Sequence, residues 1–187
     1  MRRIELIHEL KKWDDGGREV FTISDLMKVT RSESPDVLSN ALWRDNKTEK
    51  PILKRVLPGV YIFTLSSRPR THTAETIART LRRGSHCYVS LESALSEYGR
   101  ISQIPVGRLT VMTTGRSGTF ETNGFGTIEL THTDRVQEQF AGDLVNVGRP
   151  LRLASEQLAL ADLRRVGRNL HMIQPAEDLE EAIAYEA

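Results

Sequence analysis

The side chains best suited to bind another molecule lie between residues 31 and 55. Asn40 can form two hydrogen bonds with an adenine base, and Arg44 can do the same with guanine. Ser39 and Lys47 flank this pair on the same side of a predicted helix. Nearby cations could neutralise backbone phosphates and release their counterions. They are Arg31, Lys50, Lys54 and Arg55. The chemistry that these residues favour is recognition of a DNA duplex.

A helix that begins after Ser34 must position Asn40 and Arg44. Serine before a helix accepts a hydrogen bond from the first turn, and Pro35 loses nothing in the first helical position, where the N–H would be unpaired anyway. Four apolar residues are predicted to share the buried side of this helix: Val37, Leu38, Ala41 and Leu42. We expect Trp43 to pack against the hairpin that follows rather than to stack on a base.

Two further helices and a hairpin surround this helix in the sequence. Apolar residues three or four apart predict a helix over Ile4–Trp13, and Thr22 is a predicted N-cap for a short helix over Ile23–Val29. Ile52–Val56 and Val60–Phe63 are β-rich and are joined by a Pro-Gly turn. Three short helices followed by a hairpin is the order of a winged helix-turn-helix, in which the helix before the hairpin enters the major groove.

A stretch without apolar side chains, Ser66–Arg70, follows the hairpin and predicts a linker. The expected organisation is a winged helix-turn-helix DNA-binding domain over residues 1–66, a linker over 67–70, and a mixed α+β domain over 71–187. If the linker lies along DNA, Arg68 and Arg70 would add affinity that does not depend on base sequence.

The second domain is expected to combine helices with a small antiparallel sheet. Helices are predicted over Thr73–Arg83, Leu91–Tyr98, Glu156–Val166 and Pro175–Glu186. Short strands are predicted over Cys87–Val89 and Leu151–Ala154. Three strand-like runs separated by glycine-containing turns predict an antiparallel meander. These runs are Leu109–Thr114, Thr119–Thr122 and Thr127–Thr131.

Three segments of the chain carry a family resemblance: Leu53–Tyr61, Tyr88–Gly99 and Leu153–Leu163. They resemble the AbiEi-type antitoxins of bacterial type IV toxin-antitoxin and phage-abortive-infection systems, and they run in that family's order over nearly the whole chain. The last segment departs from the family pattern, because Gln157 stands where lysine is common. The chain ends soon after this segment, so it resembles a compact member that lacks a long C-terminal extension.

The resemblance implies a protein that binds operator DNA, represses its own operon and counteracts a toxin of nucleotidyltransferase-like fold. The residues alone leave open a winged-helix transcriptional regulator, or an adaptor that engages proteins, without an antitoxin role. Dimeric reading of half-sites is common for such folds, so a homodimer on DNA fits the prediction, although the sequence shows no dimer seam.

The sequence offers no constellation for catalysis. Gly115–Gly118 lacks the Gly-Lys-Ser/Thr end of a phosphate-binding loop, and His132 stands in no ligand spacing with another histidine. Ser90 and Ser155 precede apolar helices, so we expect them to be caps rather than nucleophiles. The single cysteine, Cys87, excludes a Cys-rich zinc site. We expect no enzyme activity, no cofactor and no metal.

Charge is divided unevenly along a chain whose formal net charge is only +1. Residues 1–66 carry 12 Lys and Arg against 10 Asp and Glu, residues 67–100 carry 6 against 3, and residues 101–187 carry 8 against 12. The cationic part is the half predicted to meet a polyanion. The sequence contains no run of about 18 apolar residues and begins with a charged, amphipathic stretch, so we expect a cytoplasmic protein with no membrane partner.

Overall fold

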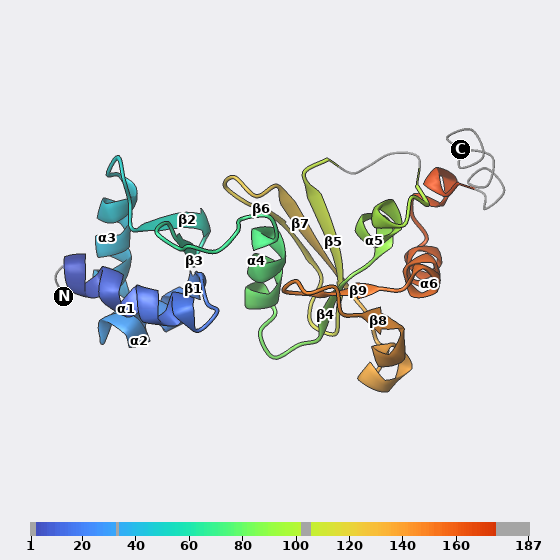
Figure 1. The fold of residues 1–187 in the computed structure, drawn as a ribbon, viewed down its shortest axis with the longest axis horizontal. Helices are drawn as coiled ribbons and strands as arrows, with labels where there is room; N and C mark the ends of the chain where they lie inside the picture. Colours follow the sequence, from blue (N-terminus) through green and yellow to red (C-terminus); the bar gives the residue numbers. More distant parts are fainter. Residues whose placement is uncertain (1–2, 33, 102–105, 175–187) are drawn as a thin grey trace. The chain divides into compact units, whose positions relative to one another are not determined.

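The computed structural model describes residues 3–32, 34–101 and 106–174, and this part of the chain contains six α-helices and two sheets (Figure 1). The predicted mixed α+β composition is confirmed. The chain divides into two compact units. The first extends to Thr80 and includes Glu121–Phe125, and the second comprises Leu81–Phe120 and the residues from Gly126 onward.

The first unit contains three helices and a small antiparallel sheet in the strand order β1-β3-β2. Its elements are α1 (Arg3–Asp15), β1 (Val20–Thr22), α2 (Ile23–Thr30), α3 (Pro35–Asn46), β2 (Leu53–Leu57) and β3 (Val60–Phe63). The helices and the hairpin predicted for this half lie within two residues of these bounds. Their apolar sides meet in one core, formed by residues such as Leu10, Phe21, Leu26, Leu42, Leu53 and Phe63.

Local hydrogen bonds explain where α2 and α3 begin. Thr22 Oγ1 accepts a hydrogen bond from Asp25 N at 3.2 Å, and Asp25 Oδ2 accepts one from Thr22 N at 2.9 Å, so the two residues form a capping box. Ser34 Oγ accepts a hydrogen bond from Val37 N at the start of α3. Gly59 turns the chain between β2 and β3 with a φ of +75°, a conformation that favours glycine. These starts and this turn are encoded within a few residues of sequence.

The predicted linker is held against the first unit. Ser66 Oγ donates a hydrogen bond to Asp14 Oδ1 at 2.5 Å, and Arg68 Nε donates one to Asp14 O at 3.0 Å. Arg70 donates to Phe63 O at 2.8 Å. The division between the units falls at the C-terminal end of α4 (Thr73–Leu81) instead of at residues 67–70. The lack of apolar side chains in this stretch did not reveal the buried carboxylate that binds it.

The second unit is built on a six-stranded sheet in the order β6-β7-β5-β4-β9-β8. The strands are β4 (Cys87–Val89), β5 (Arg108–Thr113), β6 (Gly118–Glu121), β7 (Thr127–His132), β8 (Leu144–Val145) and β9 (Arg152–Ala154). The sheet is mixed, because β5 pairs with β7 and β4 with β9 in parallel, whereas β4–β5 and β8–β9 are antiparallel.

The predicted antiparallel meander is therefore wrong, although its three strands exist. In a meander β6 would lie between β5 and β7, but here β7 lies directly beside β5 and runs in the same direction. The turn glycines correctly marked where the strands end. Alternating apolar residues set which face of a strand is buried and carry no information on which strand becomes its neighbour.

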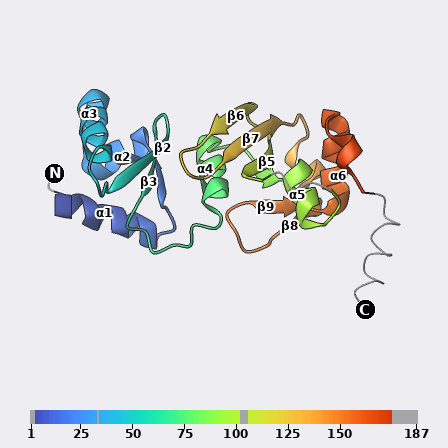
Figure 2. The same cartoon turned by 90° about the horizontal axis from the view of Figure 1, so that it is seen from above.

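Two helices of the second unit pack against each other beside the sheet. They are α5 (Leu91–Glu97) and α6 (Glu156–Val166), and they lie side by side in both Figure 1 and Figure 2. Short 3₁₀ turns cover Gln137–Gln139, Ala141–Asp143 and Leu170–Met172. The helix predicted over Pro175–Glu186 lies outside the described residues. Among the helices that are described, none is long and apolar enough to cross a membrane.

Candidate nucleic-acid interface

Helix α3 presents a polar, cationic line of side chains to solvent. Leu38 and Leu42 point into the core and are 6% and 4% exposed. Asn40, Arg44 and Lys47 are exposed on the opposite side, with the spacing of four and three that keeps residues on one helix face. The structure thus brings together three of the residues predicted to contact DNA.

The buried side of α3 is narrower than predicted. Val37 is 64% exposed and Ala41 is also exposed, so the prediction that both lie on the core side is wrong. Successive helical residues are about 100° apart, and the core-facing direction is set by Leu38 and Leu42. Val37 and Ala41 precede these leucines by one residue and therefore lie at the edge of the outward face.

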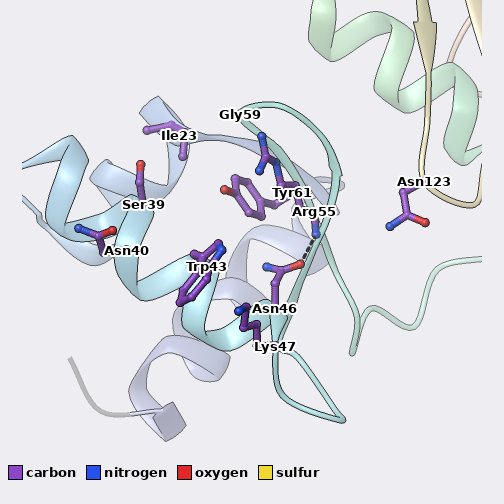
Figure 3. A pocket seen from close by; sticks show the side chains of 10 residues that line it. All are labelled: Ile23, Ser39, Asn40, Trp43, Asn46, Lys47, Arg55, Gly59, Tyr61 and Asn123. Atoms are coloured by element: carbon purple, nitrogen blue, oxygen red, sulfur yellow. Dashed lines mark hydrogen bonds between the residues drawn. The ribbon is translucent and has the colours of Figure 1, made fainter.

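A surface hollow lies between α3 and the hairpin, and Figure 3 shows the side chains around it. Helix α3 contributes Ser39, Asn40, Trp43, Asn46 and Lys47, and the first unit adds Ile23, Arg55, Gly59 and Tyr61. Hydrogen-bond donors and acceptors, two cations and two aromatic rings therefore line the same concave surface.

Trp43 is more exposed than its place in the sequence predicts. It is 56% exposed and lines the hollow, so it is not buried against the hairpin as predicted. Lys47 Nζ lies 3.8 Å from the centroid of its ring, a cation–π contact across one helical turn. Helical geometry could have signalled this position, because Trp43 is four residues from both Ser39 and Lys47.

The two adjacent cations of β2 point to opposite faces of the hairpin. Lys54 is paired with Ile62 and Arg55 with Tyr61, and successive strand residues alternate between faces. Tyr61 belongs to the core cluster under α3, so its partner Arg55 lies on the α3 side and lines the hollow. Lys54 is exposed on the other face. Of these two predicted phosphate ligands, only Arg55 joins the surface of α3.

Four further residues that were predicted to contact DNA do not line the hollow. Arg31 is exposed at the C-cap of α2, just before α3, with a φ of +53°. Lys50 is exposed in the turn between α3 and β2. Arg68 forms an ion pair with Asp14 at 3.7 Å, and Arg70 forms one with Glu19 at 3.4 Å. Because these carboxylates are buried, we leave Arg68 and Arg70 out of the interface.

Two residues at the end of α3 fix the hairpin relative to the helix. Asn46 Nδ2 donates hydrogen bonds to Leu42 O at 3.0 Å and Leu53 O at 2.7 Å, and its Oδ1 accepts one from Arg55 N at 2.7 Å. Asp45 Oδ2 accepts hydrogen bonds from the backbone N–H groups of residues 52 and 53. Neither residue stands out in the sequence, because their partners on the hairpin side lie seven to nine residues away.

Replacing Asn46 with alanine should lower the free energy of unfolding of the first unit by about 1–3 kcal/mol, since Leu53 O and Arg55 N lose their partner. Urea titration monitored by tryptophan fluorescence reports this unit, because both tryptophans lie in it. Asn40→Ala is the matched control: Asn40 is exposed on the same helix, so its change should stay within about 0.5 kcal/mol. Equal effects of the two substitutions would contradict the assigned role.

The second unit holds a buried polar cluster that links the segments Tyr88–Gly99 and Leu153–Leu163. Asp162 of α6 is fully buried, and its Oδ2 accepts hydrogen bonds from Ser90 Oγ at 2.8 Å and Tyr88 Oη at 3.1 Å. Its Oδ1 accepts one from Arg135 at 2.7 Å. Burial raises the pKa of Asp162, and the hydrogen bond from Ser90 and the charge of Arg135 oppose that shift.

Of the two predicted serine caps, the structure contradicts one and confirms the other. Ser90 Oγ turns to Asp162, so the prediction that Ser90 caps α5 is wrong. Ser155 Oγ accepts a hydrogen bond from Leu158 N at 3.2 Å and caps α6, as predicted. Among the described residues, no group of three or more His, Cys, Asp or Glu side chains could hold a metal ion.

His132 is predicted to titrate above the ordinary histidine pKa of about 6.5. Its Nδ1 lies 2.7 Å from Gly115 O and its Nε2 lies 2.8 Å from Asp134 Oδ1, so the doubly protonated ring satisfies both acceptors, and both bonds raise its pKa. The stabilisation is fully present below the ordinary pKa and is lost as pH rises through the raised one. An NMR titration of the imidazole signals should show this shift. It should shrink in Asp134→Asn, and an unshifted pKa in the wild type would contradict the assignment.

Comparisons with known proteins bear on the fold. No protein-family model matches the chain, and no curated protein matches it. The crystal structure of the RV2827C protein from Mycobacterium tuberculosis is similar, with a TM-score of 0.51 and 14% sequence identity over 87% of this chain. The chain spans 61% of the length of that protein. The likeness concerns the fold alone.

Proposed function

We propose that this chain is a DNA-binding antitoxin that represses its own operon, with the first unit as a winged helix-turn-helix. The observation that carries the DNA-binding half is the exposed line of Asn40, Arg44 and Lys47 on α3. The amide and the guanidinium suit the acceptor and donor pattern of adenine and guanine in the major groove, and the lysine suits a phosphate.

The surroundings of α3 support this role. The first unit has the order helix, strand, helix, helix, hairpin, and α3 directly precedes the hairpin, as the recognition helix of a winged helix does. Arg31 lies before the N-terminus of α3, and Arg55 extends the cationic surface onto the hairpin. The hydrogen bonds of Asn46 hold the hairpin and the helix in one rigid surface.

Arg44→Ala tests the base-reading role of α3. Binding is measured by fluorescence anisotropy with duplex DNA from upstream of the chain's own gene and with a shuffled duplex of the same composition. We expect Arg44→Ala to weaken binding to the upstream duplex by about 1–3 kcal/mol and to reduce the preference over the shuffled one, because a bidentate contact to guanine is lost.

Two control variants separate base reading from charge. Lys47→Ala should weaken binding to both duplexes about equally and reduce the salt slope by about one unit. Arg164→Ala removes an exposed cation of α6 and should leave both affinities unchanged. A wild-type chain that binds the two duplexes equally would contradict the proposal.

The antitoxin half of the proposal rests on the resemblance to the AbiEi-type antitoxins. Tyr88 and Ser90 come from one resembling segment and Asp162 from the other, and both hydroxyls donate hydrogen bonds to Asp162 inside the second unit. Residues that carry the resemblance therefore share a structural role, which supports a common fold of this unit. The proposed partner is a toxin of nucleotidyltransferase-like fold.

Co-expression tests this half independently of DNA binding. The chain is produced together with the product of the gene downstream of its own, provided that this gene encodes a nucleotidyltransferase-like protein that arrests growth. We expect the wild type and Arg44→Ala to restore growth equally. A downstream gene of another kind, or growth arrest that persists, favours a winged-helix regulator without an antitoxin role. Copurification with a neighbouring gene product in the absence of DNA binding favours an adaptor.

A further inference from the structure

The outward face of α3 carries an apolar strip beside its polar line. Val37 is 64% exposed, and Ala41, one turn further along, is exposed as well. They lie three residues before Asn40 and Arg44 respectively, so each apolar side chain is a neighbour of a proposed base-reading side chain. The strip therefore belongs to the surface that faces DNA in the proposed function.

The major groove of DNA offers one apolar group, the C5 methyl of thymine. The side chain of valine consists of two methyl groups and forms no hydrogen bonds, so its gain on binding comes from removing apolar surface from water. Val37 and Asn40 are separated by about 4.5 Å along the helix axis, close to the rise of about 3.4 Å between base pairs. The side chains of Val37 and Asn40 can thus contact neighbouring base pairs.

We propose, on the premise of the DNA binding proposed above, that Val37 and Ala41 read thymine methyl groups in the major groove. The recognised site then contains thymine next to the adenine that Asn40 contacts. This deepens the proposed function, because it assigns specificity to two residues that form no hydrogen bond with a base. Val37 is the stronger determinant, since its side chain presents two methyl groups and that of Ala41 presents one.

The test uses the full chain and a selected DNA sequence. Duplexes that the wild type enriches from a random-sequence pool define a consensus. Each thymine of the consensus is then replaced in turn by deoxyuridine, which removes the methyl group and keeps the hydrogen-bonding edge. We expect one or two replacements to weaken wild-type binding about fourfold each, the factor that corresponds to ~0.8 kcal/mol for one buried methyl group.

Variants assign the effect to the strip. Val37→Ser should lose the preference for thymine at one of the sensitive positions and keep it at a position that Ala41 contacts, with an unchanged melting temperature, because Val37 is exposed. Leu65→Ser is the matched control: Leu65 is 52% exposed in the first unit, outside α3, and its variant should keep the wild-type preference for thymine.

The possible results separate this inference from the proposed function. Enriched duplexes that tolerate every deoxyuridine replacement overturn the inference and leave the proposed DNA binding standing. Val37→Ser that retains the full preference for thymine also overturns it, and points to a protein as the partner of this strip. A pool from which no sequence is enriched overturns the proposed function and the inference together.

Discussion

Asp162→Ala is expected to lower the free energy of unfolding of the second unit by about 3–5 kcal/mol. The substitution removes the acceptor of Ser90, Tyr88 and Arg135 at once and leaves the guanidinium, which is 24% exposed, without its carboxylate. Breaking a buried ion pair from one side costs more than the pair contributes, because the remaining charge stays partly desolvated.

Hydrogen exchange of the α6 amides under native conditions measures this loss, and tryptophan fluorescence reports the first unit separately. We expect faster exchange in α6 and an unchanged fluorescence transition. Asp134→Ala is the control, because Asp134 also pairs with an arginine, Arg165, but its side chain is 78% exposed, so it should cost at most about 1 kcal/mol. Equal exchange in the two variants would show that the buried cluster contributes no more than a surface pair.

Gly126→Ala is expected to destabilise the second unit by about 2–4 kcal/mol. Gly126 has a φ of +72°, and a Cβ atom placed on it would lie 2.1 Å from Gly107 O, a backbone atom that also accepts a hydrogen bond from Thr127 N. The parallel ladder of β5 and β7 begins at the next residues, so the clash would push apart the two strands where their pairing starts.

Gly148→Ala separates the clash from the backbone strain. Gly148 has the same φ of +72°, but a Cβ atom there would have no neighbour within 4 Å among the described residues. It should therefore cost only the strain of the left-handed conformation, about 1–2 kcal/mol. Thermal unfolding followed by circular dichroism compares the two variants. A melting temperature of Gly126→Ala equal to that of Gly148→Ala would show that the close approach to Gly107 has no energetic consequence.

The elements of the first unit could be predicted because their signals are local. Thr22 with Asp25 and Ser34 with Pro35 mark helix starts within four residues of sequence, and the spacing of Leu38 and Leu42 marks a core-facing side. The site on α3 followed from the same periodicity, so Asn40, Arg44 and Lys47 were correctly placed on one exposed face. The sequence spacing predicts which side chains share a helix face because an α-helix repeats every 3.6 residues regardless of its surroundings.

Other features depended on contacts between residues far apart in the chain. From the sequence, Arg68 and Arg70 were expected to be available to DNA. In the structure they form ion pairs with Asp14 and Glu19, which lie about 50 residues earlier in the chain. Ser90 was predicted to cap a helix, but its hydroxyl donates a hydrogen bond to Asp162, which lies 72 residues later in the chain. A hydroxyl such as that of Ser90 can form either of two hydrogen bonds. The tertiary fold determines which partner lies within reach, and sequence spacing does not reveal that partner.

Composition, periodicity and capping residues were sufficient to define the mixed α+β composition, the bounds of most elements and a cationic helix face, since each depends on interactions within a few residues. The three-dimensional fold alone decided that β7 runs parallel beside β5, that Arg55 and not Lys54 joins the surface of α3, and that Val37 and Trp43 are exposed. Strand order and side-chain exposure depend on how whole elements pack, and that packing minimises the free energy of the entire unit.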